Sequence, residues 1–415
     1  MQAAEEWNVS PASPVYVILR YAKDRNVRGR KMTDNPFRYG ELVSGQFFTN
    51  RERELAELES DLGSGQNIVV ISPRRYGKTS LILMVIERLR KQGVLVAYLD
   101  LFGVPSKAAL VQRLAKSLHA GFLSPARQRL QAVVDAFKGL SVTPRLSLGP
   151  DGTPTLELMP AGTEADHDRD LEVLFELPAK IARERRARVA IVIDEFQEIL
   201  SIGTELPGLM RSVFQHQPEV AHVFLGSRFH LMNDLFNKVA EPLYKSAKPV
   251  PLRPLDRADF AAFIRERFGA TGMAIGPEAL DRTLGITACH PNDTQQLAHF
   301  TWSLCKATDQ EPTLAAVETA LTRVIAAEDA HYTAIWEGLS QGQKAVLIAL
   351  AKAGGDVFGE RYRRENLLGP ASSVQGALSR LKAKELVHCR EGNEYEIADT
   401  FLRYWIRQVV SKDAW

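Results

Sequence analysis

Short apolar runs alternate with helical segments between Asn67 and Leu252 of the 415-residue chain. Strands that are apolar along their whole length, separated by helices, are typical of a parallel sheet covered on both faces. The pattern therefore predicts an α/β domain whose five strands are Asn67–Ile71, Val94–Leu99, Val189–Ile193, His222–Leu225 and Lys248–Leu252.

An insertion at Ser141–Pro160 interrupts this alternation between the second and third strands. Its arms, Val142–Leu148 and Thr153–Leu158, alternate apolar and polar residues on either side of a Gly-Pro-Asp-Gly turn. This pattern predicts a β-hairpin on an edge or face of the sheet. The pattern leaves open whether the hairpin contacts DNA, a neighbouring subunit or only the sheet.

The periodicity becomes helical after Pro254, where we expect helices at Leu255–Phe268, Pro277–Ile286, Asp293–Lys306 and Thr313–Ala327. Further helices follow from Leu339, and then two short strands flank Glu391-Gly392-Asn393. Helices followed by a two-stranded hairpin are the outline of a winged helix. The predicted parts are an arm (1–45), the α/β core (46–254), a helical domain (255–335) and a winged helix (336–415).

The overall composition excludes several classes of protein. The longest apolar runs fall short of the roughly 18–20 residues of a membrane span, so we expect no membrane partner. The three cysteines form no CxxC pair, which disfavours zinc or disulfide sites and favours a cytoplasmic location. The net charge is only +2, so any nucleic-acid surface must come from local clustering.

A phosphate-binding loop is predicted at Ser72–Thr79, which follows one strand and opens a helix. It matches GxxxxGK[ST] except that Ser72 replaces the first glycine. The glycine before the lysine lets backbone N–H groups approach phosphate, the lysine neutralises phosphate oxygens, and the threonine hydroxyl ligates Mg²⁺. We expect ATP to contact Ser72, Pro73, Arg74, Arg75, Tyr76, Gly77, Lys78, Thr79 and Ser80.

The second half of the site is predicted where the third strand ends, at Asp194-Glu195. Asp194 is expected to hold Mg²⁺ and Glu195 to act as the base that polarises the attacking water. An Asp-Glu pair at a strand end is common, but a phosphate loop in the same domain favours the catalytic interpretation.

Ser227 and Arg228 follow the next strand along the chain. We expect Ser227 to contact the γ-phosphate or the water. Arg228 is either a charge sensor or the partner of a neighbouring carboxylate.

These motifs resemble those of the archaeal-type AAA+ ATPases and, more distantly, of archaeal origin-binding initiators and signal-transducing STAND ATPases. The resemblance rests on Asn35-Pro36-Phe37, Phe48–Glu52, the phosphate loop, Asp194–Gln197, Gly226–Arg228 and His290-Pro291. It implies an α/β AAA+ P-loop core with a parallel sheet of order 5-1-4-3-2, a helical lid and a C-terminal winged helix. It also implies ATP and Mg²⁺ as cofactors.

The resemblance further implies roles for residues outside the two main motifs. Arg51 belongs to a segment that packs near the adenine, although it is also plausible as a helix-start residue. His290 lies in the lid motif, where it either contacts phosphate or caps a helix. Lys245 and Arg211 are the candidate arginine-finger substitutes, and neither matches well, so we expect slow hydrolysis without a partner.

The winged helix carries a candidate DNA-binding face. From Leu339 onward there are 12 Lys and Arg residues against 9 Asp and Glu residues, a mildly basic balance. In a helix-turn-helix arrangement the exposed face of the second helix enters the major groove. We expect possible contacts from Gln375, Ser379, Arg380, Lys382 and Lys384, with Arg390 on the wing.

Two functions follow from this sequence. The first is a Mg²⁺-dependent ATPase whose nucleotide state moves the lid and the winged helix on double-stranded DNA. The second is a STAND-like nucleotide switch that acts through protein contacts in signalling or defence. Whether the chain forms a homo-oligomer or binds a protein partner is left open.

Overall fold

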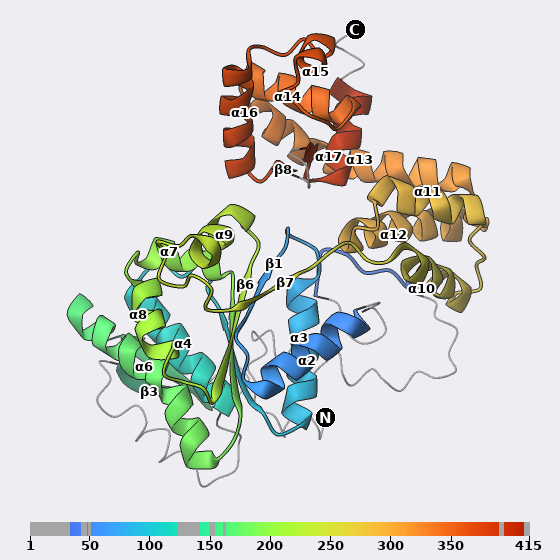
Figure 1. Cartoon of the computed structure of the whole chain (residues 1–415). Helices are drawn as coiled ribbons and strands as arrows, with labels where there is room; N and C mark the ends of the chain where they lie inside the picture. The colour runs from blue at the N-terminus through green and yellow to red at the C-terminus, as the bar shows by residue number, and fades with distance from the viewer. Residues whose placement is uncertain are drawn as a thin grey trace. The chain divides into compact units, whose positions relative to one another are not determined.

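The computed structural model describes residues 34–42, 48, 51–122, 142–148, 154–160, 163–389 and 394–410, and gives 142–148 and 154–160 as backbone only. The described residues form two compact units. Residues 42–253 make the first unit, and residues 34–41 with 254–410 make the second. Figure 1 colours the first unit from blue to green and most of the second from yellow to red.

The first unit is built on a five-stranded parallel sheet. Its order, β2-β5-β6-β1-β7, is the predicted 5-1-4-3-2 order read from the other edge, which confirms the expected fold class. Because all strands are parallel, their carboxyl ends lie at one edge of the sheet. The strands are β1 (Ile68–Ile71), β2 (Leu95–Asp100), β5 (Val189–Asp194), β6 (Val220–Gly226) and β7 (Lys248–Pro251).

Helices cover both faces of this sheet (Figure 1). Alternate strand residues point to opposite faces, so β1, β2, β5 and β6 each supply side chains to two separate apolar clusters, whereas β7 supplies only Val250 to one of them. One face packs on α2 (Glu52–Ser64) and α3 (Lys78–Lys91). The other face packs on α4 (Lys107–Phe122), α6 (Glu164–Arg185), α8 (Leu206–Phe214) and α9 (Phe229–Asn237). Two short helical elements, η3 (Phe196–Glu198) and α7 (Ile199–Ile202), follow β5.

The predicted hairpin is present as two antiparallel strands, β3 (Val142–Leu148) and β4 (Pro154–Pro160). Its backbone register pairs Leu146 with Leu156. The two strands form a sheet of their own rather than extending the parallel sheet, and the backbone of β4 runs close to α4.

The second unit is mainly helical. Its α13 helix runs from Leu314 to Glu337, ten residues beyond the predicted end, and passes without a break through the boundary expected after residue 335. One apolar cluster extends from the lid helices into the winged helix. The elements are α10 (Arg257–Ala270), α11 (Pro277–Thr287), α12 (Pro291–Thr308), α13, α14 (Gln341–Lys352), α15 (Glu360–Glu365), α16 (Ala371–Ala383), β8 (Val387–Cys389), β9 (Tyr395–Ile397), α17 (Thr400–Trp405) and a π-helical turn (Ile406–Val410).

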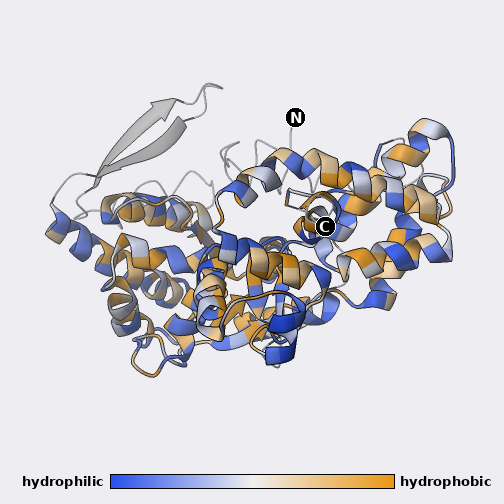
Figure 2. Cartoon of the chain, turned by 90° about the horizontal axis from the view of Figure 1, so that it is seen from above, coloured by the Kyte–Doolittle hydropathy of each residue, from blue (hydrophilic) through white to orange (hydrophobic). Residues whose placement is uncertain are grey.

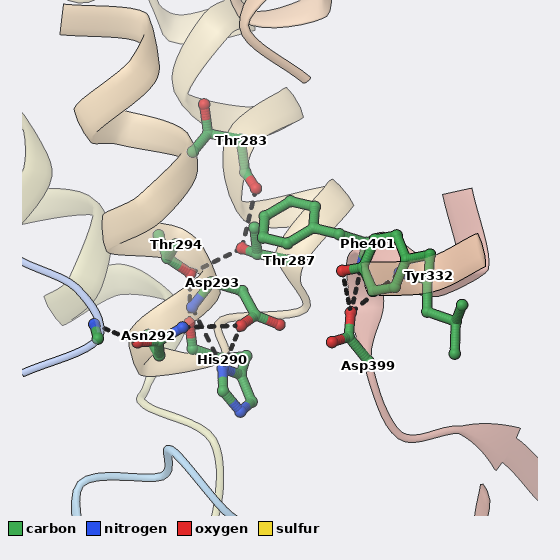
Figure 3. A network of polar contacts seen from close by, with 11 residues as sticks. Thr283, Thr287, His290, Asn292, Asp293, Thr294, Tyr332, Asp399 and Phe401 are labelled. Atoms are coloured by element: carbon green, nitrogen blue, oxygen red, sulfur yellow. Dashed lines mark hydrogen bonds and ion pairs between the residues drawn. The ribbon is translucent and has the colours of Figure 1, made fainter. Parts of the chain in front are cut away.

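Partly buried polar contacts join α13 to both ends of α17. The Tyr332 hydroxyl donates to Asp399 Oδ1 at 3.0 Å, and the Trp405 indole donates to Asp329 Oδ1 at 2.7 Å. Burial raises the pKa of Tyr332, with the negative charge of Asp399 adding to the shift, so the phenol stays a donor. Figure 3 shows Asp399 between Tyr332 and the backbone of α17, whose amino end it caps. The lid helices and the winged helix therefore form one compact body.

Residues 34–41 pack on the second unit although they precede the first in the sequence. The Asn35 amide donates to His299 O at 3.0 Å and to Ser303 Oγ at 2.9 Å. Phe37 is completely buried against Phe268, with ring centroids 4.8 Å apart. The chain therefore leaves the second unit before Arg51 and re-enters it after Arg253.

Hydrophobic and hydrophilic residues are mixed along the helices of both units (Figure 2). Of the helices that the structure describes, none combines the length and the apolar character needed to cross a bilayer.

Replacing Phe37 with Ala should lower the free energy of unfolding of the second unit by about 3–5 kcal/mol, because the change empties a fully buried aromatic site. Urea unfolding followed by tryptophan fluorescence measures the loss. The control is Phe102→Ala, at a side chain that is 69% exposed in the first unit, with an expected change within about 0.5 kcal/mol. Equal effects of the two changes would mean that residues 34–41 do not hold the second unit together.

Candidate nucleotide-binding site

The predicted phosphate loop connects β1 to α3. Gly77 has φ = 82° at the amino end of α3, a left-handed conformation that glycine adopts at little cost. Arg75 is also left-handed, with φ = 65°. The backbone therefore turns sharply before α3, whose first N–H groups lie at the turn and lack carbonyl partners within the helix.

Lys78 is the first residue of α3, and its side chain is buried. Its ammonium donates to the backbone carbonyl of Ser72 at 3.2 Å, across the mouth of the loop. Ser72 is itself buried, so a small residue fits at the position where glycine is usual. Around them Pro73, Tyr76 and Thr79 are half-buried, Arg74 and Arg75 are exposed, and Ser80 is buried.

Asp194 joins three parts of the site. Its Oδ2 accepts hydrogen bonds from the Thr79 hydroxyl at 2.9 Å and from the Tyr98 hydroxyl at 2.7 Å. Its Oδ1 accepts from the Glu195 backbone N–H at 2.8 Å. Burial raises the pKa of Tyr98 well above its usual value, and the charge of Asp194 raises it further, so Tyr98 remains a donor. Asp194 thus connects β2, β5 and α3.

Thr79 and Asp194 fit a magnesium ion. A hydroxyl and a carboxylate oxygen 2.9 Å apart are hard oxygen donors, which Mg²⁺ prefers. The described residues contain no cluster of three His, Cys, Asp or Glu side chains that would enclose a metal alone. An ion at this position would complete its shell with phosphate oxygens and water.

Glu195 follows Asp194 in a left-handed conformation, with φ = 49°. Its Oε2 accepts a hydrogen bond from Ser227 Oγ at 2.9 Å and another from Gln197 Nε2. Ser227, which was expected to contact phosphate or water, therefore contacts the candidate base. Arg228 lies 3.5 Å from Glu198, which is the carboxylate-pairing alternative.

Arg51 is buried under the phosphate loop. One guanidinium nitrogen donates to Arg253 O at 2.8 Å and to Tyr76 O at 3.4 Å, and the other donates to Glu54 at 2.7 Å. Phe48 packs against the α2–α3 cluster, and the rest of the segment between Phe48 and Arg51 lies outside the described residues. Arg51 thus ties the loop to the last residue of the first unit.

His290 lies in the second unit, at the amino end of α12 (Figure 3). Its Nδ1 accepts from the Asp293 N–H at 3.3 Å and lies 3.2 Å from Asp293 Oδ1. Burial alone would raise the pKa of Asp293, but His290 and nearby hydrogen bonds lower it by more, so this carboxylate is held ionised. Within this unit His290 is a helix cap, which was the alternative to phosphate contact.

The predicted DNA-contact residues do not form one uniform face. Gln375, Ser379, Arg380 and Lys384 are exposed on or just after α16. Lys382 is different, because its ammonium lies 4.6 Å from the centre of the Tyr395 ring and 3.3 Å from the Tyr395 hydroxyl. It therefore packs against β9. Arg390 lies outside the described residues.

Lys245 and Arg211, the two candidate arginine-finger substitutes, both lie in the first unit. The Lys245 ammonium lies 5.2 Å from the centre of the Tyr244 ring, and Arg211 is part of α8.

Tyr98 and the side-chain role of Gln197 were not predicted from the sequence. A signal existed for Tyr98, since its hydroxyl interrupts the apolar residues that precede Asp100 in β2. Gln197 was noted only as part of a motif, because periodicity does not show which way a side chain turns after a strand end.

Comparisons with known proteins agree with this architecture. A family model for an ATPase domain predominantly from Archaea matches residues 48–281, and one for a probable winged helix domain matches residues 330–408. A search of curated proteins found no match.

Two solved structures share the fold. A Walker-type ATPase of Pyrococcus abyssi aligns with a TM-score of 0.61 and 16% identity, over 90% of this chain and 99% of its own. The Aeropyrum pernix ORC2 protein aligns with a TM-score of 0.50 and 14% identity, over 93% of this chain and 99% of its own. The expected resemblance to archaeal-type AAA+ ATPases is confirmed. Since the ATPase family model covers more than half of the chain, the protein belongs to the family of ATPase domains found predominantly in Archaea, with a winged helix domain following the ATPase domain.

Proposed function

We propose that this protein is a Mg²⁺-dependent ATPase that turns over slowly without a partner and uses its nucleotide state to move the second unit, with its lid and winged helix, on DNA. The observation that carries the proposal is the contact between Thr79 and Asp194, with Glu195 held beside it by Ser227. That arrangement supports a metal-binding pair with a carboxylate base beside it, where the end of β5 meets the first turn of α3. The Aeropyrum pernix ORC2 structure was solved with ADPNP and ADP, which supports an adenine nucleotide.

The proposed division of labour follows from the chemistry of each group. The N–H groups of the Ser72–Thr79 loop bind the triphosphate, and Lys78 exchanges the Ser72 carbonyl for phosphate oxygens. Thr79 and Asp194 hold Mg²⁺, which when bound neutralises charge on the phosphates. Arg51 keeps the loop in shape through the Tyr76 carbonyl.

Hydrolysis needs a base and an in-line water. Glu195 takes a proton from the water as the water oxygen bonds to the γ-phosphorus. The bond from that phosphorus to the oxygen bridging to the β-phosphate breaks, which leaves ADP. The proton then passes from Glu195 to the phosphate product. Ser227 orients the base through its hydrogen bond.

DNA as the target is supported by the exposed face of helix α16 in a winged helix. Gln375, Ser379, Arg380 and Lys384 are the side chains proposed to approach DNA. We do not include Lys382 among them, because it packs on Tyr395.

A nucleotide switch that acts through protein contacts is the second candidate, in signalling or defence. It is favoured by α15, two of whose three arginines are paired with glutamates on the same helix. Arg361 pairs with Glu365 at 2.7 Å, and Arg364 pairs with Glu360 at 3.0 Å. These pairs reduce the positive charge that α15 offers to DNA, so a homo-oligomer contact or another protein partner is the alternative output.

Replacing Lys78 with Ala should weaken Mg·ATP binding by about tenfold to a hundredfold, because a charge-assisted contact to phosphate is lost. Fluorescent-nucleotide titration measures the dissociation constant. Lys91→Ala is the control, since Lys91 is on the same helix but 63% exposed and paired with Glu87. Equal affinities of the two variants would remove Lys78 from the site.

Replacing Glu195 with Gln should leave Mg·ATP affinity within about twofold and lower turnover by about a hundredfold or more, since the amide cannot accept the water's proton. Phosphate release under saturating ATP measures turnover. Hydrolysis by the variant at the wild-type rate would show that another group is the base.

The double change Arg380→Glu/Lys384→Glu should weaken binding to mixed-sequence duplex DNA by about tenfold or more at low salt, and reduce the salt slope by about two. Fluorescence anisotropy over a salt series measures both. Lys306→Glu/Arg323→Glu makes the same charge change at exposed positions of α12 and α13 and serves as the control. If both doubles bind alike, or the wild type does not bind, the protein-contact switch is the better account.

A further inference from the structure

The Gln197 side chain is buried next to the candidate base. It follows β5 in the single turn of η3 and is only 2% exposed. Its Nε2 donates to Glu195 Oε2. Its Oε1 is buried and has no hydrogen-bond partner among the residues that the structure describes. The oxygen and the nitrogen of a buried amide normally both have hydrogen-bond partners. Because only the nitrogen of Gln197 has one, the contact with Glu195 explains an amide at this position better than packing does.

The direction of Glu195 depends on side-chain contacts. Its left-handed backbone, with φ = 49°, turns the residue out of the strand, so the alternation of β5 no longer sets where its carboxylate points. Two donors from different elements meet on the same oxygen, Oε2: Ser227 at the end of β6 and Gln197 in η3. No hydrogen bond from a described residue reaches the other carboxylate oxygen, Oε1. That oxygen can therefore accept a proton from a water molecule.

Gly226 leaves room for the amide. A Cβ added at Gly226 would lie 2.7 Å from Gln197 Oε1 and 2.4 Å from Met232 Sδ. Gly226 is not among the residues with positive φ, so space rather than backbone conformation requires glycine here. Gly226 also directly precedes Ser227. The end of β6 therefore accommodates one of the two donors to Glu195 and supplies the other.

We propose that Gln197 is a positioning residue for ATP hydrolysis, which holds Oε2 of Glu195 so that Oε1 faces the attacking water. The inference rests on the proposed function, because it assigns a role within the same hydrolytic site. Gln197 does not touch the nucleotide, so it acts on turnover and not on nucleotide affinity.

The test replaces Gln197 with Met, which keeps the length of the side chain and removes the donor. The kcat for ATP should fall about tenfold to a hundredfold, as for a misplaced catalytic group, while KM and the dissociation constant for Mg·ATP change less than about twofold.

Gln217→Met is the matched control. Gln217 is also buried in the first unit, donates through Nε2 to Phe175 O at 2.8 Å, and has an Oε1 without a partner among the described residues. It lies before β6, whereas the site lies after the strand ends. This variant should change thermal stability about as much as Gln197→Met and leave kcat within about twofold of wild type.

The outcomes separate the two proposals. If wild type hydrolyses ATP but Gln197→Met and Gln217→Met have the same kcat, the role of Gln197 is refuted and the ATPase stands. If wild type binds Mg·ATP without turning it over, both proposals are refuted.

Discussion

The hydrogen bond between Thr79 and Asp194 is the contact on which the rest of the site depends. It joins the first turn of α3 to the end of β5. The helix α3 follows β1, and the sheet order places β6 between β1 and β5. Ser227, at the end of β6, therefore lies within reach of Glu195. A parallel sheet brings these strand ends to one edge, and Tyr98 on β2 completes the arrangement from the other neighbour of β5.

The strands and the motifs at both halves of the site could be predicted because they depend on local sequence, whereas the sheet order was expected only from the family resemblance. A buried strand followed by a glycine turn and a lysine can be recognised without knowing the rest of the fold. The contacts of Tyr98 and Gln197 could not be predicted, since they depend on strand register and on a single left-handed residue. The length of α13 and the packing of Phe37 were missed for a related reason, because both follow from long-range packing on a shared core.

The packing of the second unit bears on the movement in the proposed function. Its lid helices and winged helix share one apolar core, reinforced by the Tyr332–Asp399 and Trp405–Asp329 hydrogen bonds. A close-packed protein interior is hardly compressible, so elements that share one core move together. A movement of this unit would thus carry the winged helix with the lid. Arg51 donates to the Tyr76 carbonyl of the phosphate loop and to the carbonyl of Arg253, the residue after which the chain re-enters the second unit.

A crystal structure of the full chain grown with Mg²⁺ and a non-hydrolysable ATP analogue tests the central claim most directly. The account predicts a triphosphate on the backbone N–H groups of the Ser72–Thr79 loop and a metal about 2.1 Å from Thr79 Oγ1, next to Asp194. It also predicts that the direct Thr79–Asp194 hydrogen bond gives way to the ion. A structure in which that bond persists under saturating nucleotide, with the metal or the triphosphate bound elsewhere, would contradict it.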